Sequence, residues 1–384
     1  MDAIEHAPTA TVRQLQRAAS DACDGARASP GHVRSLRATA RALASPHGQD
    51  ILGVMDLRRR ADGEHTYIRG VVDNEDFKII FLQSDAQAEL SGRMRYVMVD
   101  TTFDVVAPGA AREGVSQAGI DASAAMDYDW HHVSFVTWVY SLNRAVVVLR
   151  AMVIGKCREM YSEIFSFYFR NAMMHGLDAP VAVVVAPGRP RAKKPFVAVL
   201  LDFETAEHDG AFRAMSRTFG GSPADFHGRS IGCRVHFIGF LLKKCGNDIH
   251  HPFLRSVVAL RDSPPAGGMT EVVARLSALK DTANAAGETK QATALKWLLH
   301  NRAAREAAFP LSSCTLSRTE VLAAGQTTNA IESLNRQTQL EVKQQGSPTL
   351  LGAIRALMDF DATTMLEVLP KGQAFSVARS LEGF

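Results

Sequence analysis

The sequence predicts an α/β fold, a mixed sheet flanked by helices, with an all-α insertion before the last predicted helices. Three observations lead to this prediction. Three β-rich runs follow one another at 95–106, 131–140 and 145–154. Helical and strand-like segments then alternate between 158 and 237. Beyond residue 246 the strand pattern ends and amphipathic helical patterns replace it, which indicates a separate helical block.

Each element has a local signal. Asn143 and Arg144, between the second and third runs, predict a tight hairpin turn. The run "REMYSEIFSFYFRNAMMHG" has apolar residues near helical spacing and Gly176 as its stop. "FVAVLLDF" is almost wholly apolar and so predicts a central strand. "TAEHDGAFRAMSRTFGG" predicts a helix, and "RSIGCRVHF" predicts a short strand that runs into another helix.

Three antiparallel strands that lead into a βαβ crossover have the layout of the ribonuclease H-like fold. The predicted organisation has four parts. They are an Arg/Ala-rich helical region at 1–64, a ribonuclease H-like core at 65–245, a helical insertion at 246–326 and helices that complete the core at 327–384.

The composition is that of a globular protein, with 384 residues, 46% of them hydrophobic and 22% charged. No apolar segment reaches the roughly 18 residues needed to cross a bilayer, so no membrane partner is expected. The five cysteines are scattered and odd in number, which favours a reducing, intracellular location, nuclear if the source is eukaryotic. A net charge of +3 does not by itself indicate nucleic-acid binding. For the Arg-rich region at 1–64 a solvated helical arm is favoured over a DNA-contacting arm or a transit peptide.

Two aspartates end apolar strand runs. Asp100 follows "VMV" in the first strand and Asp202 follows "AVLL" in the fourth. These strands are neighbours in a ribonuclease H-like sheet, so their carboxylates would converge and raise each other's pKa. A pair of Mg²⁺ or Mn²⁺ ions relieves that repulsion and supports phosphodiester chemistry. The alternative for each aspartate is a turn or helix-cap role.

Glu332, in "TTNAIESLNRQ", is the candidate third carboxylate, because a helix after the helical block can return over the sheet edge. The alternative is structural. The spacing of Asn329 and Glu332 also fits a capping box, in which Glu332 serves only the start of its helix.

The motifs "VDTTFDVV", "LDFETAEHDGAFRAM", "IGCRVHFIGFLLKK" and "TTNAIESLNRQ" occur in the order found in Mutator-like element (MULE) transposases. They resemble that family's Asp-Gly-Thr-Phe strand, Asp-Phe-Glu-x-Ala junction, Cys-x-x-His segment and Thr-Asn-Asn-x-x-Glu helix, over residues 95–360. The resemblance implies a DDE enzyme in which Asp100, Asp202 and Glu332 are catalytic and bind two metal ions. It also implies DNA strand cleavage and transfer without a covalent enzyme intermediate.

The sequence departs from that family in three ways. Thr101 replaces the expected glycine, residues 104–131 lengthen the first connection, and the zinc modules frequent in the family are missing. These departures support a second hypothesis, a domesticated and catalytically inactive DNA- or protein-binding module. A third hypothesis, a different ribonuclease H-like nuclease, would use Asp202, Glu204 and Asp209.

Cys233 and His236 have three competing interpretations. By the resemblance they lie near the active site; a zinc site with Cys245 and His250 or His251 is disfavoured, because the intervening "FIGFLLKK" looks helical. A buried cysteine beside a hydrogen-bonded histidine is a third possibility.

The proline-framed stretch "GRPRAKKP" predicts an exposed basic loop that contacts DNA phosphates or serves as a nuclear-import signal, although a merely solvated loop is more frequent. Its basic residues are Arg189, Arg191, Lys193 and Lys194. By the resemblance to MULE transposases, DNA is the expected partner; a homo-oligomer stays open, and no small-molecule substrate is expected.

Overall fold

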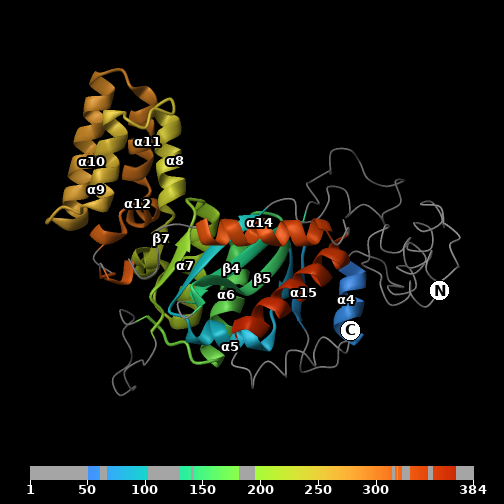
Figure 1. Ribbon diagram of the computed structural model, residues 1–384. Helices are drawn as coiled ribbons and strands as arrows, with labels where there is room; N and C mark the ends of the chain where they lie inside the picture. Colours follow the sequence, from blue (N-terminus) through green and yellow to red (C-terminus); the bar gives the residue numbers. More distant parts are fainter. Residues whose placement is uncertain are drawn as a thin grey trace, which may run out of the picture.

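In the computed structural model, a mixed sheet is covered by helices and a block of helices stands at one end of it (Figure 1). The structure describes residues 51–60, 67–102, 130–139, 142–180, 195–313, 316–317, 319–321, 329–344 and 349–368. The expected mixed sheet flanked by helices is confirmed. None of the helices among these residues is long and apolar enough to cross a membrane.

The sheet has seven strands in the order β1-β2-β5-β4-β3-β6-β7. Their bounds are Ile68–Asp73 (β1), Lys78–Leu82 (β2), Tyr96–Thr102 (β3), His131–Val139 (β4), Arg144–Ile154 (β5), Ala198–Leu201 (β6) and Ser230–Gly232 (β7). The neighbours β1 and β2, β2 and β5, β5 and β4, and β4 and β3 pair antiparallel. The neighbours β3 and β6, and β6 and β7, pair parallel. Asn143 adopts φ 49° just before β5, as the predicted hairpin turn requires.

Helices supply the crossovers and both covering layers. One layer contains α5 (Asp85–Arg93), α6 (Arg158–Met174) and α7 (Thr205–Phe219), and the other contains α4 (Ile51–Arg60), α14 (Asn329–Gln344) and α15 (Leu350–Val368). The chain connections between the parallel neighbours β3 and β6, and between β6 and β7, contain helices, because parallel strands need such crossovers. Helix α6 ends at its cap His175, followed by Gly176 at φ 100°, the stop that the sequence predicts.

The side chains of β3 and β6 alternate between the two layers. Val97 and Val99 join the core beneath α6 and α7, whereas Met98 joins the core beneath α14. In β6, Leu201 likewise belongs to the first core and Leu200 to the second. By this period of two, Asp100 lies on the α14 face of the sheet.

The helical block consists of α8 (Arg234–Lys244), α9 (Pro252–Asp262), α10 (Gly268–Ala285), α11 (Thr289–His300) and α12 (Arg302–Ala308). It has its own apolar core, which includes Phe237, Leu254 and Leu298. Two short 3₁₀ helices, η4 (Pro223–Arg229) and η5 (Pro310–Ser312), flank β7 and the block. The buried Arg261 joins block and sheet, because its guanidinium donates to the carbonyl of Gly232 at 3.0 Å.

The sequence did not predict the β1–β2 hairpin or α5. The hairpin extends the sheet beyond β5. Helix α5 packs against β5, next to α6. The Arg/Ala-rich stretch up to residue 50 and the predicted long connection, apart from residues 130–131, lie outside the described residues.

Candidate functional site

Asp100 and Asp202 stand at the same end of two adjacent parallel strands. Asp100 lies near the end of β3, and Asp202 follows the last residue of β6. Burial, followed by the negative charge of Asp202, raises the pKa of Asp100 to about 6; Glu332 acts in the same direction, and a hydrogen bond from Asn335 acts against it. The three predicted carboxylates therefore influence one another electrostatically.

His208 links the backbone of Asp202 to the neighbouring strand β7. Its backbone carbonyl accepts a hydrogen bond from Nε2 of His208, whose Nδ1 lies 3.0 Å from the hydroxyl of Ser230 on β7. Burial lowers the pKa of His208 to about 4, so this histidine is neutral at pH 7. A neutral imidazole donates from one nitrogen and accepts at the other, which fits both contacts.

His236, on the first turn of α8, lies between Asp202 and Glu332. Its Nδ1 is 2.7 Å from Oδ1 of Asp202, and its Nε2 is 3.9 Å from Oε1 of Glu332. The contact with Asp202, followed by that with Cys233, raises the pKa of His236 to about 11. Without metal, this imidazolium is the nearest counter-ion to two carboxylates.

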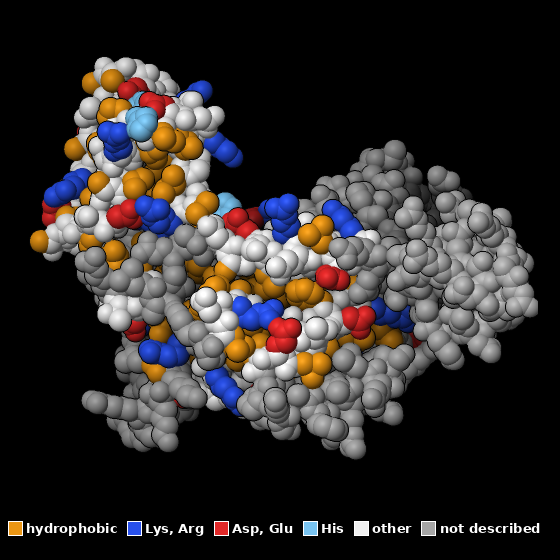
Figure 2. All heavy atoms as spheres, in the orientation of Figure 1, with side chains coloured by type: hydrophobic (Ala, Val, Ile, Leu, Met, Phe, Trp, Pro, Cys, Tyr) orange, Lys and Arg blue, Asp and Glu red, His pale blue; other side chains and the backbone are white. Residues whose placement is uncertain are grey.

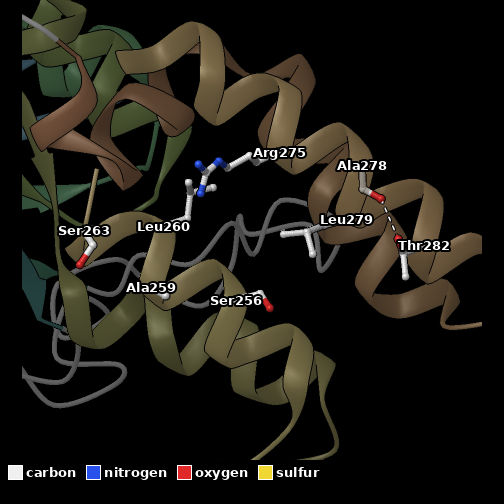
Figure 3. Close-up of a pocket in the computed structure, with 8 residues that line it drawn as sticks. All are labelled: Ser256, Ala259, Leu260, Ser263, Arg275, Ala278, Leu279 and Thr282. Atoms are coloured by element: carbon white, nitrogen blue, oxygen red, sulfur yellow. Dashed lines mark hydrogen bonds between the residues drawn. The ribbon is translucent and has the colours of Figure 1, made fainter. Parts of the chain in front are cut away.

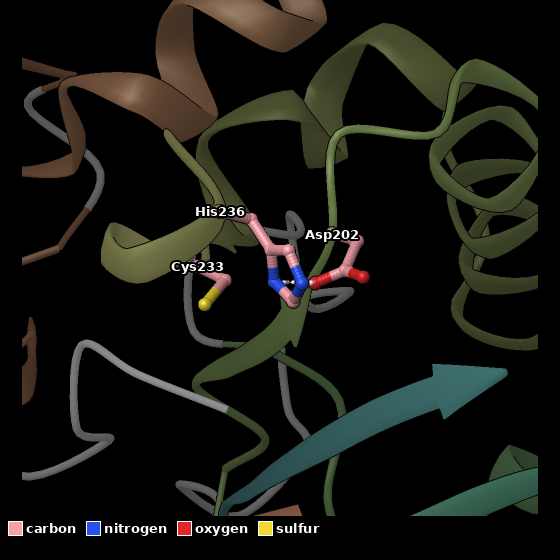
Figure 4. Close-up of side chains that lie close together, drawn as sticks. All are labelled: Asp202, Cys233 and His236. Carbon is pink, nitrogen blue, oxygen red and sulfur yellow. Dashed lines mark ion pairs between the residues drawn. The ribbon is translucent and has the colours of Figure 1, made fainter. Parts of the chain in front are cut away.

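Cys233, the N-cap residue of α8, completes a compact group of donors. The ligand atoms of Asp202, Cys233 and His236 all lie within 4.8 Å of one another (Figure 4). Cys245 caps the opposite end of α8, so about 18 Å of helix separates it from Cys233. The four-ligand zinc site with Cys245 is therefore wrong. Among the described residues, a zinc ion would instead find one thiol, one imidazole and one carboxylate here.

Two donor sets thus share Asp202. The oxygen set, Asp100, Asp202 and Glu332, has the ligand type that suits Mg²⁺ or Mn²⁺, but it is linked by charge and does not form a compact group among the described residues. The mixed set, Asp202, Cys233 and His236, is compact and suits a softer ion such as Zn²⁺. Both sets lie where the carboxyl ends of β3 and β6 meet the start of α8.

Glu204 and Asp209, the other two acids of the third hypothesis, lie outside the candidate metal group of the described residues. Glu204, the N-cap residue of α7, forms an ion pair of 3.0 Å with Lys156. Asp209 lies further along α7 and belongs to no candidate metal group among the described residues. This arrangement gives the oxygen set no ligand from that motif other than Asp202.

Sequence reasoning missed two residues of the site. Asn335, one turn after Glu332 on α14, donates from Nδ2 to Oδ2 of Asp100 at 2.7 Å. Glu207, on the first turn of α7, is 2% exposed and its Oε1 has no hydrogen-bond partner in the described chain. Burial, then the charges of Asp202 and Asp100, raise the pKa of Glu207 well above its usual range.

Thr101 fits its strand without disturbing it. It pairs with Val133 in the β3–β4 register, and its hydroxyl lies 3.1 Å from that of Tyr161 on α6. The departure from the expected glycine therefore leaves the strand that holds Asp100 intact.

Between the helical block and α14 the surface is notched, with basic side chains on both sides (Figures 1 and 2). Helix α14 exposes Arg336 and Lys343, and α8 exposes Lys243. The predicted basic residues Arg189, Arg191, Lys193 and Lys194 lie outside the described residues.

A separate hollow of about 510 Å³ lies inside the helical block, between α9 and α10 (Figure 3). Small and aliphatic residues line it, and Arg275 is the one charged residue among the described residues of the lining. None of the predicted carboxylates contributes to it.

Comparison with protein-family models, curated proteins and solved structures gives no significant match.

Proposed function

We propose that the chain cleaves and transfers DNA strands as a DDE enzyme, with Asp100, Asp202 and Glu332 as its catalytic carboxylates. The observation that supports this most directly is geometric: Asp100 and Asp202 stand at the same end of the parallel strands β3 and β6, and His236 lies 2.7 Å from Asp202 and 3.9 Å from Glu332 of α14. Acids that repel one another in a folded protein are a common mark of a functional site.

The topology supports the same proposal. The order β5-β4-β3-β6-β7, with β4 antiparallel to its neighbours and β6 and β7 parallel to β3, agrees with the ribonuclease H-like layout expected from the sequence. In this proposal the β1–β2 hairpin is an addition at the far edge, away from β6.

The residues fit a divalent-cation cofactor. Burial and, after it, the charge of Asp202 raise the pKa of Asp100, and a cation would offset both; His236 already occupies a cationic position beside Asp202. Bound Mg²⁺ or Mn²⁺ ions would activate the attacking oxygen and stabilise the leaving oxygen of a phosphodiester. Asp100, Asp202 and Glu332 would hold them.

The chain's own residues have further roles. Asn335 holds one oxygen of Asp100, and His236 compensates charge beside Asp202 and Glu332. The exposed basic residues of α14 and α8 would contact the phosphates of a DNA strand. A DNA substrate also agrees with the expected intracellular location.

Nicking of supercoiled DNA with Mn²⁺ tests the proposal. We expect nicking by the wild type, no nicking by Asp202→Asn, and unchanged nicking by the control Asp281→Asn, whose side chain is 71% exposed on α10. A folded wild type that nicks no DNA at saturating Mn²⁺ would refute the proposal. That result would favour the domesticated, inactive DNA- or protein-binding module.

A further inference from the structure

Asn335 makes two hydrogen bonds that fix the orientation of its amide. It is 4% exposed, on the face of α14 that covers β3 and β4. Its Nδ2 donates to Oδ2 of Asp100 at 2.7 Å, and its Oδ1 accepts from the hydroxyl of Ser134 at 2.8 Å. A carboxylate only accepts hydrogen bonds, so the amide cannot be turned around.

The hydrogen bonds continue into the core from Ser134. Its Oγ lies 3.3 Å from Nδ1 and 3.4 Å from Nε2 of His132, and Nε2 of His132 lies 3.1 Å from Nη1 of Arg150. Arg150 is bound by Asp361 on α15, with Nη2 2.7 Å and Nε 2.9 Å from the two carboxylate oxygens. Ser134, His132 and Arg150 are each fully buried.

This chain has one possible direction. Arg150 can only donate, so Nε2 of His132 is its acceptor and the proton of a neutral His132 is on Nδ1. Nδ1 then donates to Ser134, whose own proton goes to Asn335. Burial and the charge of Arg150 lower the pKa of His132 well below its usual value, which agrees with a neutral ring.

We infer that Asn335 is a positioning residue for Asp100, and that the directed chain from Arg150 through His132 and Ser134 holds it in place. The chain fixes one oxygen of Asp100 and ties α14, which also carries Glu332, to the sheet. Each donor polarises the next, so the arrangement is stiffer than a single hydrogen bond. The inference rests on the proposed function, because it makes Asp100 a ligand held ready for a cation.

A purely structural network would act differently from a positioning one. Thr338, one turn beyond Asn335 on α14, also accepts from Arg150, at 3.4 Å, but it does not lead to Asp100. Thr338→Val therefore removes a buried hydrogen bond of the same cation and leaves the chain to Asp100 intact. It is the matched control for Ser134→Ala.

Calorimetric titration with Mn²⁺ tests the inference on the full chain, with thermal unfolding to verify that each variant is folded. We expect Ser134→Ala to weaken Mn²⁺ binding about 10-fold, as supporting residues of metal sites do. Thr338→Val should stay within about twofold of the wild type. In an Asn335→Leu background, Ser134→Ala should have no further effect, because it acts only through Asn335. A Ser134→Ala protein that binds Mn²⁺ like the wild type, while Asp202→Asn does not bind it, overturns the inference.

A second measurement does not depend on metal. Nitrogen NMR of ¹⁵N-histidine-labelled protein, with His132 assigned by its substitution, reports which ring nitrogen carries the proton. We expect the Nδ1-protonated tautomer; the Nε2-protonated tautomer overturns the inference. A wild type that binds no Mn²⁺ refutes the proposed function instead, and the tautomer then decides whether the chain exists.

Discussion

The Nδ1 atom of His236 lies 2.7 Å from Oδ1 of Asp202, so the start of α8 places an imidazolium against the carboxylate that follows β6. The pair connects the helical block to the sheet at the point where the candidate cation site lies. His236 thus supplies the positive charge beside Asp202 that, in the proposed function, a bound cation would supply.

His236→Gln should lower the free energy of unfolding of the metal-free protein below neutral pH and matter less as the pH rises. Because contact with Asp202 raises the pKa of His236 to about 11, the folded state keeps a proton that the unfolded state loses above about 6.5. The stabilisation is therefore complete below pH 6.5 and is lost between there and pH 11. We expect at most about 1 kcal/mol, since the side chain is 43% exposed. Urea unfolding at pH 6, 8 and 10 measures it, with His250→Gln as control; a pH-independent difference would contradict it.

Asp100→Asn should stabilise the metal-free protein at pH 7. Burial and neighbouring acids raise the pKa of Asp100 to about 6, so ionisation opposes folding above that pH and the cost disappears as the pH falls toward 4. We expect a gain of about 1–2 kcal/mol in urea unfolding at pH 7, and none at pH 4. A helix-cap or turn aspartate would give the opposite result, a loss of stability.

Cys233→Ser should separate the two donor sets. Zn²⁺ prefers thiolate and imidazole ligands, so we expect its affinity to fall by at least 10-fold. Mn²⁺ affinity should change less than about twofold, because hard oxygens dominate its binding. Competition titrations against a metal-sensitive dye measure both. Equal losses for the two ions would mean that Cys233 supports the site as a whole.

Gly232→Ala should destabilise the protein where the sheet meets α8. A Cβ atom there would lie 2.2 Å from the ring of Phe203, the residue after Asp202, so the ring must move. Overpacking of this kind costs about 1–3 kcal/mol. Gly239→Ala on α8, which has no neighbouring atom within 4 Å of the new Cβ, is the control and should be stabilising by about 0.5–1 kcal/mol. Thermal unfolding compares the pair; equal effects would argue against close packing at Gly232.

Arg150→Met should be the most destabilising of these changes, because it leaves Asp361 charged and 2% exposed without its cation. Breaking a buried ion pair costs about 3–5 kcal/mol. Arg144 pairs with Glu367 across the same two elements, β5 and α15, but at the surface. Arg144→Met should therefore cost less than about 1 kcal/mol. Similar losses of urea-unfolding stability in both variants would refute the importance of burial.

The sequence predicted β3 to β7 well because each strand is an apolar run bounded by turn or helix signals, and the parallel β3–β6 pair brings Asp100 and Asp202 to one edge. It missed β2, whose five residues "KIIFL" have no periodicity that distinguishes strand from helix. It also missed α5, although Ser84 and Gln87 form a capping box that marks the start of this helix.

The site was less predictable than the sheet. The contact of His236 with Asp202 depends on how α8 leaves β7, and the contact of Asn335 with Asp100 depends on how α14 crosses β3. The spacing of residues along the sequence does not reveal either the direction in which α8 leaves β7 or the path of α14 across β3. One signal was present: an arginine, Arg150, inside the apolar run "AVVVLRAMVI" needs a buried partner, and that partner lies 211 residues away.

That separation has a consequence for synthesis. Tyr67, Gln87 and Arg150 all bind the carboxylate of Asp361, across 294, 274 and 211 residues. At about 5–20 residues per second, the ribosome needs roughly 10–40 s to reach Asp361 after Arg150 has been made. During that time the nascent sheet holds a cation without its partner, and α14, with Glu332 and Asn335, is not yet in place. The three carboxylates therefore come together only late in translation, after the last strand of the sheet, β7, has long been made and once α14 has followed it.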